Sequence, residues 1–124
     1  MILVDTSVWV DHLRGGDLQL VELLEQSTVA MHPFVVGEIA CGSLRDRLMM
    51  LQLLQDLPAA TVADSDEVLH FIERHALHGK GIGYVDVQLL ASVALTEGAK
   101  IWTRDKKLRL VAELLGCAYQ DTAH

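Results

Sequence analysis

The sequence predicts an α/β fold in which one mainly parallel sheet lies between two layers of helices, a three-layer α/β/α sandwich. Short runs of branched apolar residues alternate with longer segments whose apolar residues recur at helical spacing. Strands that are separated by helices usually pair in parallel. The length of 124 residues suits one domain with a single core, and no linker, repeat or low-complexity segment interrupts the chain. We therefore expect residues 1–124 to form a single domain.

The first half of the chain predicts two strands and four helices. Ile2–Val4 is typical of a short buried strand, and the Asp-Thr-Ser sequence after it can cap a helix that ends at a Gly-Gly pair. A second short amphipathic helix follows it, and residues 28–31 predict another strand. Pro33 suits the first turn of a third helix. A leucine-rich helix is expected over residues 44–55.

The second half continues the alternation of helix and strand. Ser65 begins a helix with an apolar stripe, and an almost continuously apolar helix is expected over residues 84–97. Residues 99–103 predict a strand, residues 105–115 a helix and residues 117–119 a last short strand. Each predicted strand is thus separated from the next by at least one helix, which implies parallel pairing.

Composition and charge exclude several classes of protein. Ten Lys and Arg residues against seventeen Asp and Glu give a net charge of −7, which argues against a nucleic-acid binder that relies on a basic surface alone. Metal cations change the local charge, so an enzyme that meets phosphates through a bound metal remains possible. Cys41 and Cys117 form no zinc or disulfide motif. No membrane span or signal peptide is evident, so we expect a cytoplasmic protein. A mean hydropathy of +0.28 suggests apolar surface for a partner or a second copy, and a large core is the alternative.

Two acidic residues directly follow predicted strands. Asp5 follows the first strand, and Asp105 follows the strand over residues 99–103. The carboxyl ends of parallel strands meet at one edge of a sheet, where ligands bind in open α/β folds. The two carboxylates can therefore converge there. The alternative for each is a helix cap, since both positions precede predicted helices.

Two further acids stand in strongly apolar helices. Glu38 lies in the sequence Phe-Val-Val-Gly-Glu-Ile-Ala-Cys, and Asp86 in Gly-Tyr-Val-Asp-Val-Gln-Leu-Leu. A buried carboxylate needs a hydrogen-bonding, ionic or metal partner. Arg45 or Lys80 could be that partner, and Asp86 could also be a first-turn acid that favours its helix.

Together, Asp5, Glu38, Asp86 and Asp105 suit Mg²⁺ or Mn²⁺, because these hard cations prefer oxygen ligands. Such a cluster points to phosphoryl chemistry. The neighbouring hydroxyls, which could hydrogen-bond the carboxylates or water, belong to Thr6, Ser7 and Thr103. Capping and strand propensity are their alternative roles.

Half of the cations fall within ten residues beside Asp105. They are Lys100, Arg104, Lys106, Lys107 and Arg109. Contact with substrate phosphates is one interpretation, for Arg104 and Lys106 in particular, and a solvated helix face is the other. Gly79, Gly81 and Gly83 lack the spacing of a phosphate-binding loop, so they predict a flexible turn.

At these residues the sequence resembles the PIN-domain ribonucleases, most closely the VapC toxins of bacterial toxin–antitoxin pairs. The matching motifs are residues 4–11, 37–42, 83–91 and 102–108, in order and across essentially the whole chain. The resemblance implies a PIN-like fold with about five parallel strands and endonucleolytic cleavage of RNA that depends on Mg²⁺ or Mn²⁺. By position it assigns the catalytic and metal-binding roles to Asp5, Glu38, Asp86 and Asp105. Some relatives carry one more acid where this chain has Lys106 and Lys107.

The resemblance also implies partners. A cognate VapB-type antitoxin would insert a segment into the active-site groove, and the toxin would form a homodimer within a larger toxin–antitoxin assembly. Two alternatives stay open at this point. One is a non-catalytic PIN-like interaction module whose acids bind a partner's arginines, and the other is a PIN nuclease that acts in RNA processing rather than as a toxin.

Overall fold

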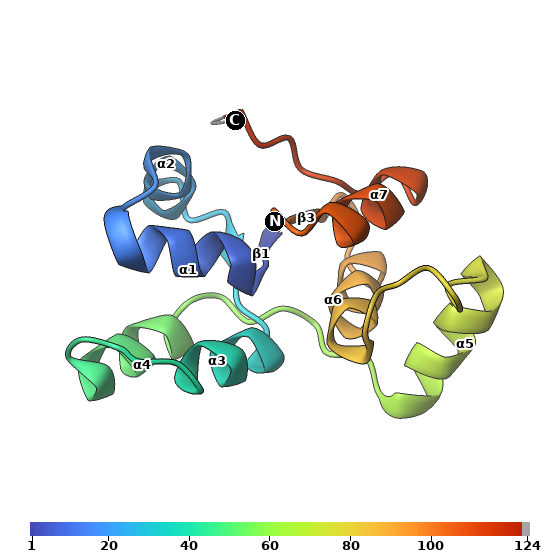
Figure 1. The fold of residues 1–124 in the computed structure, drawn as a ribbon, viewed down its shortest axis with the longest axis horizontal. Coiled ribbons are helices and arrows are strands. Elements are labelled where there is room, and N and C mark those ends of the chain that lie inside the picture. The colour runs from blue at the N-terminus through green and yellow to red at the C-terminus, as the bar shows by residue number, and fades with distance from the viewer. Residues whose placement is uncertain (123–124) are drawn as a thin grey trace.

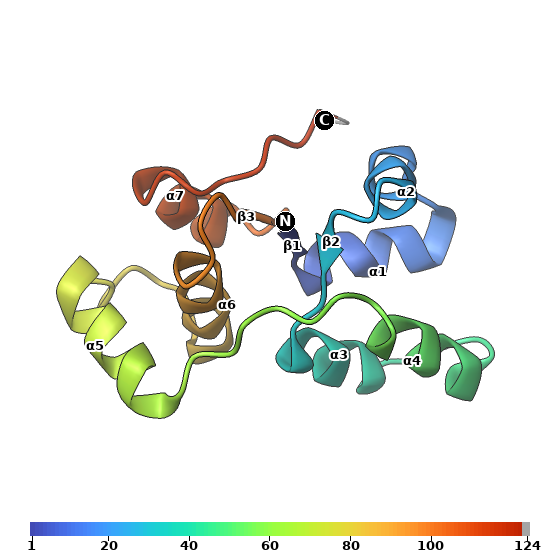
Figure 2. The same cartoon turned by 180° about the vertical axis from the view of Figure 1, so that it is seen from behind.

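The computed structural model describes residues 1–122 and places helices on both sides of a parallel sheet. The elements are β1 (Ile2–Val4), α1 (Thr6–Gly15), α2 (Leu18–Glu25), β2 (Val29–Ala30), α3 (Pro33–Ala40), α4 (Arg47–Gln55), α5 (Ser65–His75), α6 (Tyr84–Ala94), β3 (Lys100–Trp102) and α7 (Lys106–Leu114). In both cartoon views α1 to α4 lie to one side of the central strands and α5 to α7 to the other (Figure 1, Figure 2). The predicted α/β architecture is confirmed.

The sheet is parallel, with β1 in the middle and the strand order β2-β1-β3. It contains three strands within residues 1–122, fewer than the five that the resemblance implies. Each edge is extended by one isolated parallel bridge, Met31 to Ala59 beyond β2 and Ile101 to Ala118 beyond β3. The outer segments are too short to form strands, and Pro58 has no N–H to donate to a ladder. The strand predicted at residues 117–119 is therefore only a bridge at Ala118.

Most helices begin where the sequence offers an aspartate cap. The side chains of Asp5, Asp17, Asp64 and Asp105 each accept a backbone N–H in the first turn of the following helix. The helix predicted from residue 44 begins only at Arg47, because Asp46 has a left-handed backbone conformation. The helix predicted to reach residue 97 ends at Ala94. No helix within residues 1–122 is long and apolar enough to cross a membrane.

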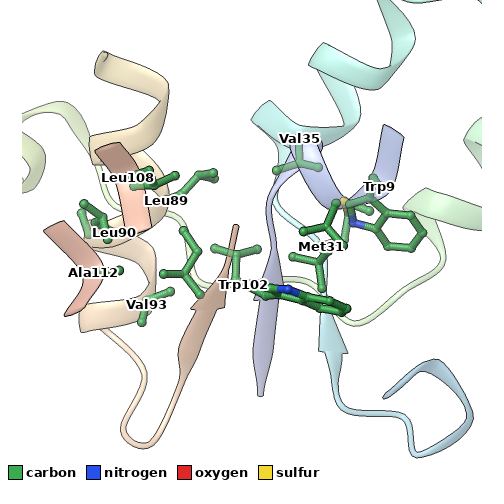
Figure 3. Packing of buried hydrophobic residues seen from close by; sticks show 14 of the residues in the cluster. Trp9, Met31, Val35, Leu89, Leu90, Val93, Trp102, Leu108 and Ala112 are labelled. Carbon is green, nitrogen blue, oxygen red and sulfur yellow. The ribbon is translucent and has the colours of Figure 1, made fainter. Parts of the chain in front are cut away.

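The core fixes the helices that carry acidic residues against the sheet. Figure 3 shows the α6 and α7 side chains packed beside β3, and other core residues on the far side of β1. The α6 and α7 group includes Leu89, Leu90, Val93, Leu108 and Ala112, and the other group includes Trp9, Met31 and Val35. All residues from Val87 to Val93 are buried, which explains why the sequence of α6 is apolar on nearly every side.

We expect Leu89→Ala to lower the free energy of unfolding by about 2–5 kcal/mol, because it leaves a cavity between α6 and the sheet. Leu89 is 0% exposed, whereas Leu95 at the end of the same helix is 45% exposed. Leu95→Ala is the matched control and should cost less than about 1 kcal/mol. Urea denaturation followed by circular dichroism measures both. Equal losses in the two variants would contradict this packing.

Candidate metal centre

Parallel pairing brings the first and last acidic motifs together. The register of β1 and β3 sets Val4 opposite Trp102, and the Asp5 N–H continues the ladder to the Trp102 carbonyl at 2.8 Å. The Thr103 hydroxyl then donates to Oδ2 of Asp5 at 2.8 Å. Asp105 begins the helix that follows. The predicted convergence of the two strand ends is thus present in the fold.

Asp5 is held rigidly by hydroxyl groups. The residue is buried, with 6% exposure. Its Oδ2 accepts hydrogen bonds from the hydroxyls of Ser7 at 2.7 Å and Thr103 at 2.8 Å. The Ser7 oxygen in turn accepts the backbone N–H of Arg104 at 2.9 Å. Within residues 1–122, Oδ1 of Asp5 accepts no hydrogen bond. The carboxylate is therefore oriented through one oxygen, and the other oxygen can bind a cation.

Asp86 connects the four acids electrostatically. It is half-buried in the first turn of α6, where it accepts the Gly83 N–H at 3.3 Å. Burial raises the pKa of Asp86 above its usual value; the Gly83 N–H opposes this, and the negative charges of Asp5, Asp105 and Glu38 raise that pKa further. All three other candidate acids therefore lie close enough to repel its charge.

Glu38 and Asp105 complete this group from two other helices. Oε1 of Glu38 on α3 accepts the Thr6 hydroxyl at 2.6 Å. Asp105 caps α7 by accepting the Leu108 N–H at 2.9 Å, and its own N–H donates to the Thr103 hydroxyl at 3.0 Å. Asp5 and Asp105 thus do cap helices, which was the alternative interpretation of both residues. They also belong to the acidic group.

The prediction that Glu38 needs a partner because it is buried is wrong. The residue is exposed, since it lies on the flank of α3 beside the buried residues Val35 and Ile39. Neither Arg45 nor Lys80 forms an ion pair with it. The ion pairs in residues 1–122 all involve Arg104.

Arg104 has a different role from the predicted contact with substrate phosphate. Its guanidinium group binds Asp11 at 2.9 Å, Asp17 at 2.5 Å and Asp121 at 2.7 Å, and it lies over the Trp102 ring. With 14% exposure and three carboxylate partners, it is not free for a substrate. It joins the turn after β3 to α1, to the α1–α2 turn and to the C-terminal segment. Sequence reasoning missed these three aspartates, because their separations along the chain give no local signal.

The predicted cationic cluster is divided by the fold. Lys100 begins β3 and so lies at the end of the strand opposite to Asp105, while Arg104 is occupied. Lys106 and Lys107 are exposed on the first turn of α7, directly after Asp105. These two lysines are the part of the cluster that lies beside the acids.

The four acids have the right donor chemistry for a hard divalent cation, but their side chains are not yet arranged around one position. All four candidate ligands are carboxylates, the donor type that Mg²⁺ and Mn²⁺ prefer. Their mutual repulsion at Asp86 is the kind of strain that a bound cation relieves. In the described part of the chain, however, no three acidic, histidine or cysteine side chains are already placed as a ligand set. Binding therefore requires side-chain adjustment.

Comparison with known proteins gives a consistent result. A family model described as the PIN domain matches residues 2–114. The chain is 49% identical over 118 residues to Ribonuclease VapC32 of Mycobacterium tuberculosis, with 95% of each chain covered. It is 29% identical over 127 residues to Ribonuclease VapC11 of Mycobacterium tuberculosis and to VapC ribonuclease Mb1587 of Mycobacterium bovis, with 92% of this chain and 93% of each relative covered.

We expect Asp86→Asn to raise the melting temperature of the metal-free protein at neutral pH. The amide keeps an acceptor for the Gly83 N–H but removes the charge that Asp5, Asp105 and Glu38 repel. Because the pKa of Asp86 is raised in the folded state, wild type loses stability as pH rises through that pKa. The gain in the variant should therefore vanish in acid, where Asp86 is already protonated.

Thermal melts in EDTA across a pH series measure this effect. Asp66→Asn is the control, because Asp66 is an exposed acid in the first turn of α5, where its charge favours the helix dipole. That variant should melt at the same temperature as wild type or lower. A lower melting temperature for Asp86→Asn at neutral pH would contradict the repulsion.

Proposed function

The chain belongs to the PIN-domain family, and we propose that it is a VapC-type toxin that cleaves RNA internally with a divalent cation. The proposed ligands are Asp5, Glu38, Asp86 and Asp105, in a single domain over residues 1–124. The observation that carries this proposal is the placement of Asp5 and Asp105 at the carboxyl ends of β1 and β3, where Thr103 hydrogen-bonds both residues. Asp86 lies close enough to these acids and to Glu38 for their charges to add to the effect of burial on its pKa. The ribonuclease names of the relatives support the reaction class.

The chain's own residues would orient the ligands. Ser7 and Thr103 fix Asp5, Thr6 fixes Glu38, and the cap of α7 fixes one oxygen of Asp105. When bound, Mg²⁺ or Mn²⁺ supplies an activated water and neutralises charge on the phosphate.

No side-chain nucleophile is required for this hydrolysis. The Ser7 hydroxyl donates to Asp5 and so is already engaged. His32 is buried, burial lowers its pKa, and its Nδ1 accepts the Phe34 N–H as the cap of α3. The Nδ1 of His12 accepts the Asp17 N–H. These contacts support structural roles for both histidines, and leave the carboxylates as the reactive groups.

We further propose that the protein acts on RNA in the cytoplasm, pairs with a VapB-type antitoxin and forms a homodimer. Exposed apolar side chains on α4 support a protein partner. Leu48 is 88% exposed, and Met49 and Leu53 are exposed on the same helix. The uncompensated carboxylates would suit a cationic segment of the antitoxin. Higher toxin–antitoxin assemblies can form on the same surfaces.

The direct test is cleavage of RNA by the purified protein with Mg²⁺, with Mn²⁺ and with EDTA. We expect cleavage only with metal. Asp5→Asn or Asp86→Asn should lower kcat by about 100-fold or more, since each removes a ligand charge. Asp66→Asn should retain wild-type activity, because Asp66 lies on α5 outside the acidic group.

Equal activity in all variants, or cleavage that persists in EDTA, would contradict the proposal. A folded protein on which metal affects neither cleavage nor thermal stability would favour the non-catalytic interaction module. Induced expression separates a toxin from a nuclease of RNA processing. Wild type should arrest bacterial growth, and Asp5→Asn should not.

A further inference from the structure

Lys107 on α7 lies against Gly81 in the loop before α6. A methyl group built on Gly81 would meet the lysine side chain at 3.0 Å from Cδ, 3.4 Å from Cε and 3.3 Å from Nζ. The absence of a side chain at Gly81 therefore lets the lysine lie directly over the loop. Gly79 has a similar left-handed backbone, with φ of 71° against 79° for Gly81, but a methyl group there would meet nothing within 4 Å.

This contact joins the two segments that carry Asp86 and Asp105. Lys107 comes two residues after Asp105, the cap of α7. Gly81 comes two residues before Gly83, whose N–H donates to Asp86. The lysine side chain therefore connects the first turn of α7, which follows Asp105, to the loop that precedes Asp86 on α6.

The charge of Lys107 stays uncompensated in this position. Within residues 1–122 the ion pairs are those of Arg104, so Lys107 pairs with none of the nearby acids. The charges that shift the pKa of Asp86 all come from carboxylates. Because Lys107 forms no ion pair with these acids, its ammonium group is available for an external anion. Phosphate is an anion that lysine commonly binds as a point charge.

We propose that Lys107, seated on Gly81, is a binding residue for a backbone phosphate of the RNA beside the cleaved bond. This inference rests on the proposed function, and it names a contact that positions the strand without reading its bases. Because the contact is electrostatic, it contributes to the salt dependence of binding. Gly81 thus allows Lys107 to take this position, since any side chain at residue 81 displaces the lysine.

The first experiment separates the charge of Lys107 from its aliphatic stem. Lys107→Met keeps a similar stem and removes the charge, while Lys107→Arg keeps a charge. We expect Lys107→Met to raise KM for RNA about 5- to 10-fold with kcat retained, and Lys107→Arg to stay near wild type. Lys100→Met is the matched control, because Lys100 is also exposed but begins β3 at the opposite end of the strand.

The second experiment uses the two glycines. Gly81→Ala and Gly79→Ala place alanine in nearly the same left-handed backbone, so they should cost similar stability. Only Gly81→Ala displaces Lys107, so only it should raise KM as Lys107→Met does. In the Lys107→Met background, Gly81→Ala should raise KM no further.

Binding measured without cleavage keeps this inference separate from the proposed function. The probe is fluorescein-labelled oligouridylate, titrated into Asp86→Asn protein with and without Lys107→Met, over a range of salt concentrations. Removal of the lysine charge should weaken binding and reduce the salt slope by about 0.7, the value for one phosphate contact to a single strand.

Unchanged affinity and salt slope after Lys107→Met would overturn the inference and leave the lysine as packing for the loop. An equal loss of affinity in Lys100→Met would overturn it too, because the effect would then come from the net charge of the protein and not from the position of Lys107. The inference would also be overturned if Asp86→Asn protein that retains Lys107 showed no salt-sensitive binding of the probe. If the Asp5 and Asp86 variants cleave RNA like wild type, the proposed function fails. The titrations, repeated in EDTA with the probe checked for full length by electrophoresis, then still decide the role of Lys107.

Discussion

The pairing of β1 with β3 is the constraint on which the rest of the site depends. A carboxylate buried at the end of a strand is unfavourable unless hydrogen bonds satisfy it. Ser7 supplies one such bond to Asp5 locally, and Asp5 gains the second only when Thr103 lies opposite. The hydroxyls of Ser7 and Thr103 both converge on one of its oxygens. Thr103 also accepts the N–H of Asp105. One threonine thus connects Asp5 to Asp105, the first and last of the four candidate ligands along the chain.

The distribution of charge explains why the acids remain available. Arg104 lies beside Asp105 in sequence, yet its guanidinium group is held by Asp11, Asp17 and Asp121 on the other side of the turn. The arginine next to Asp105 is therefore held by the scaffold, and the charges of Asp5, Asp105 and Glu38 still act on Asp86. Like-charged groups held close together are a common feature of functional sites. The acidic composition thus reflects both a scaffold and a proposed cation site.

Sequence patterns predicted the features that depend on neighbouring residues. The strand at Ile2–Val4, the capped helices and the placement of Asp5 and Asp105 after neighbouring parallel strands follow from apolar runs, cap chemistry and the geometry of parallel sheets. The exposure of Glu38 could not be predicted, because its apolar neighbours indicate a buried helix but not which side of it faces the core. The partners of Arg104 are far apart in the chain, so only the folded structure brings them together. The outer sheet positions are single bridges, whose backbone contacts leave almost no sequence pattern.

The proposed function requires that these carboxylates bind a divalent cation. The most direct test is the anomalous diffraction of Mn²⁺ in crystals of the wild-type protein. We expect a manganese peak at the carboxyl edge of the sheet, bonded to the Asp5 carboxylate and to at least one of Glu38, Asp86 and Asp105. Occupied manganese sites only elsewhere on the protein, or no bound manganese at saturating concentration, would contradict it.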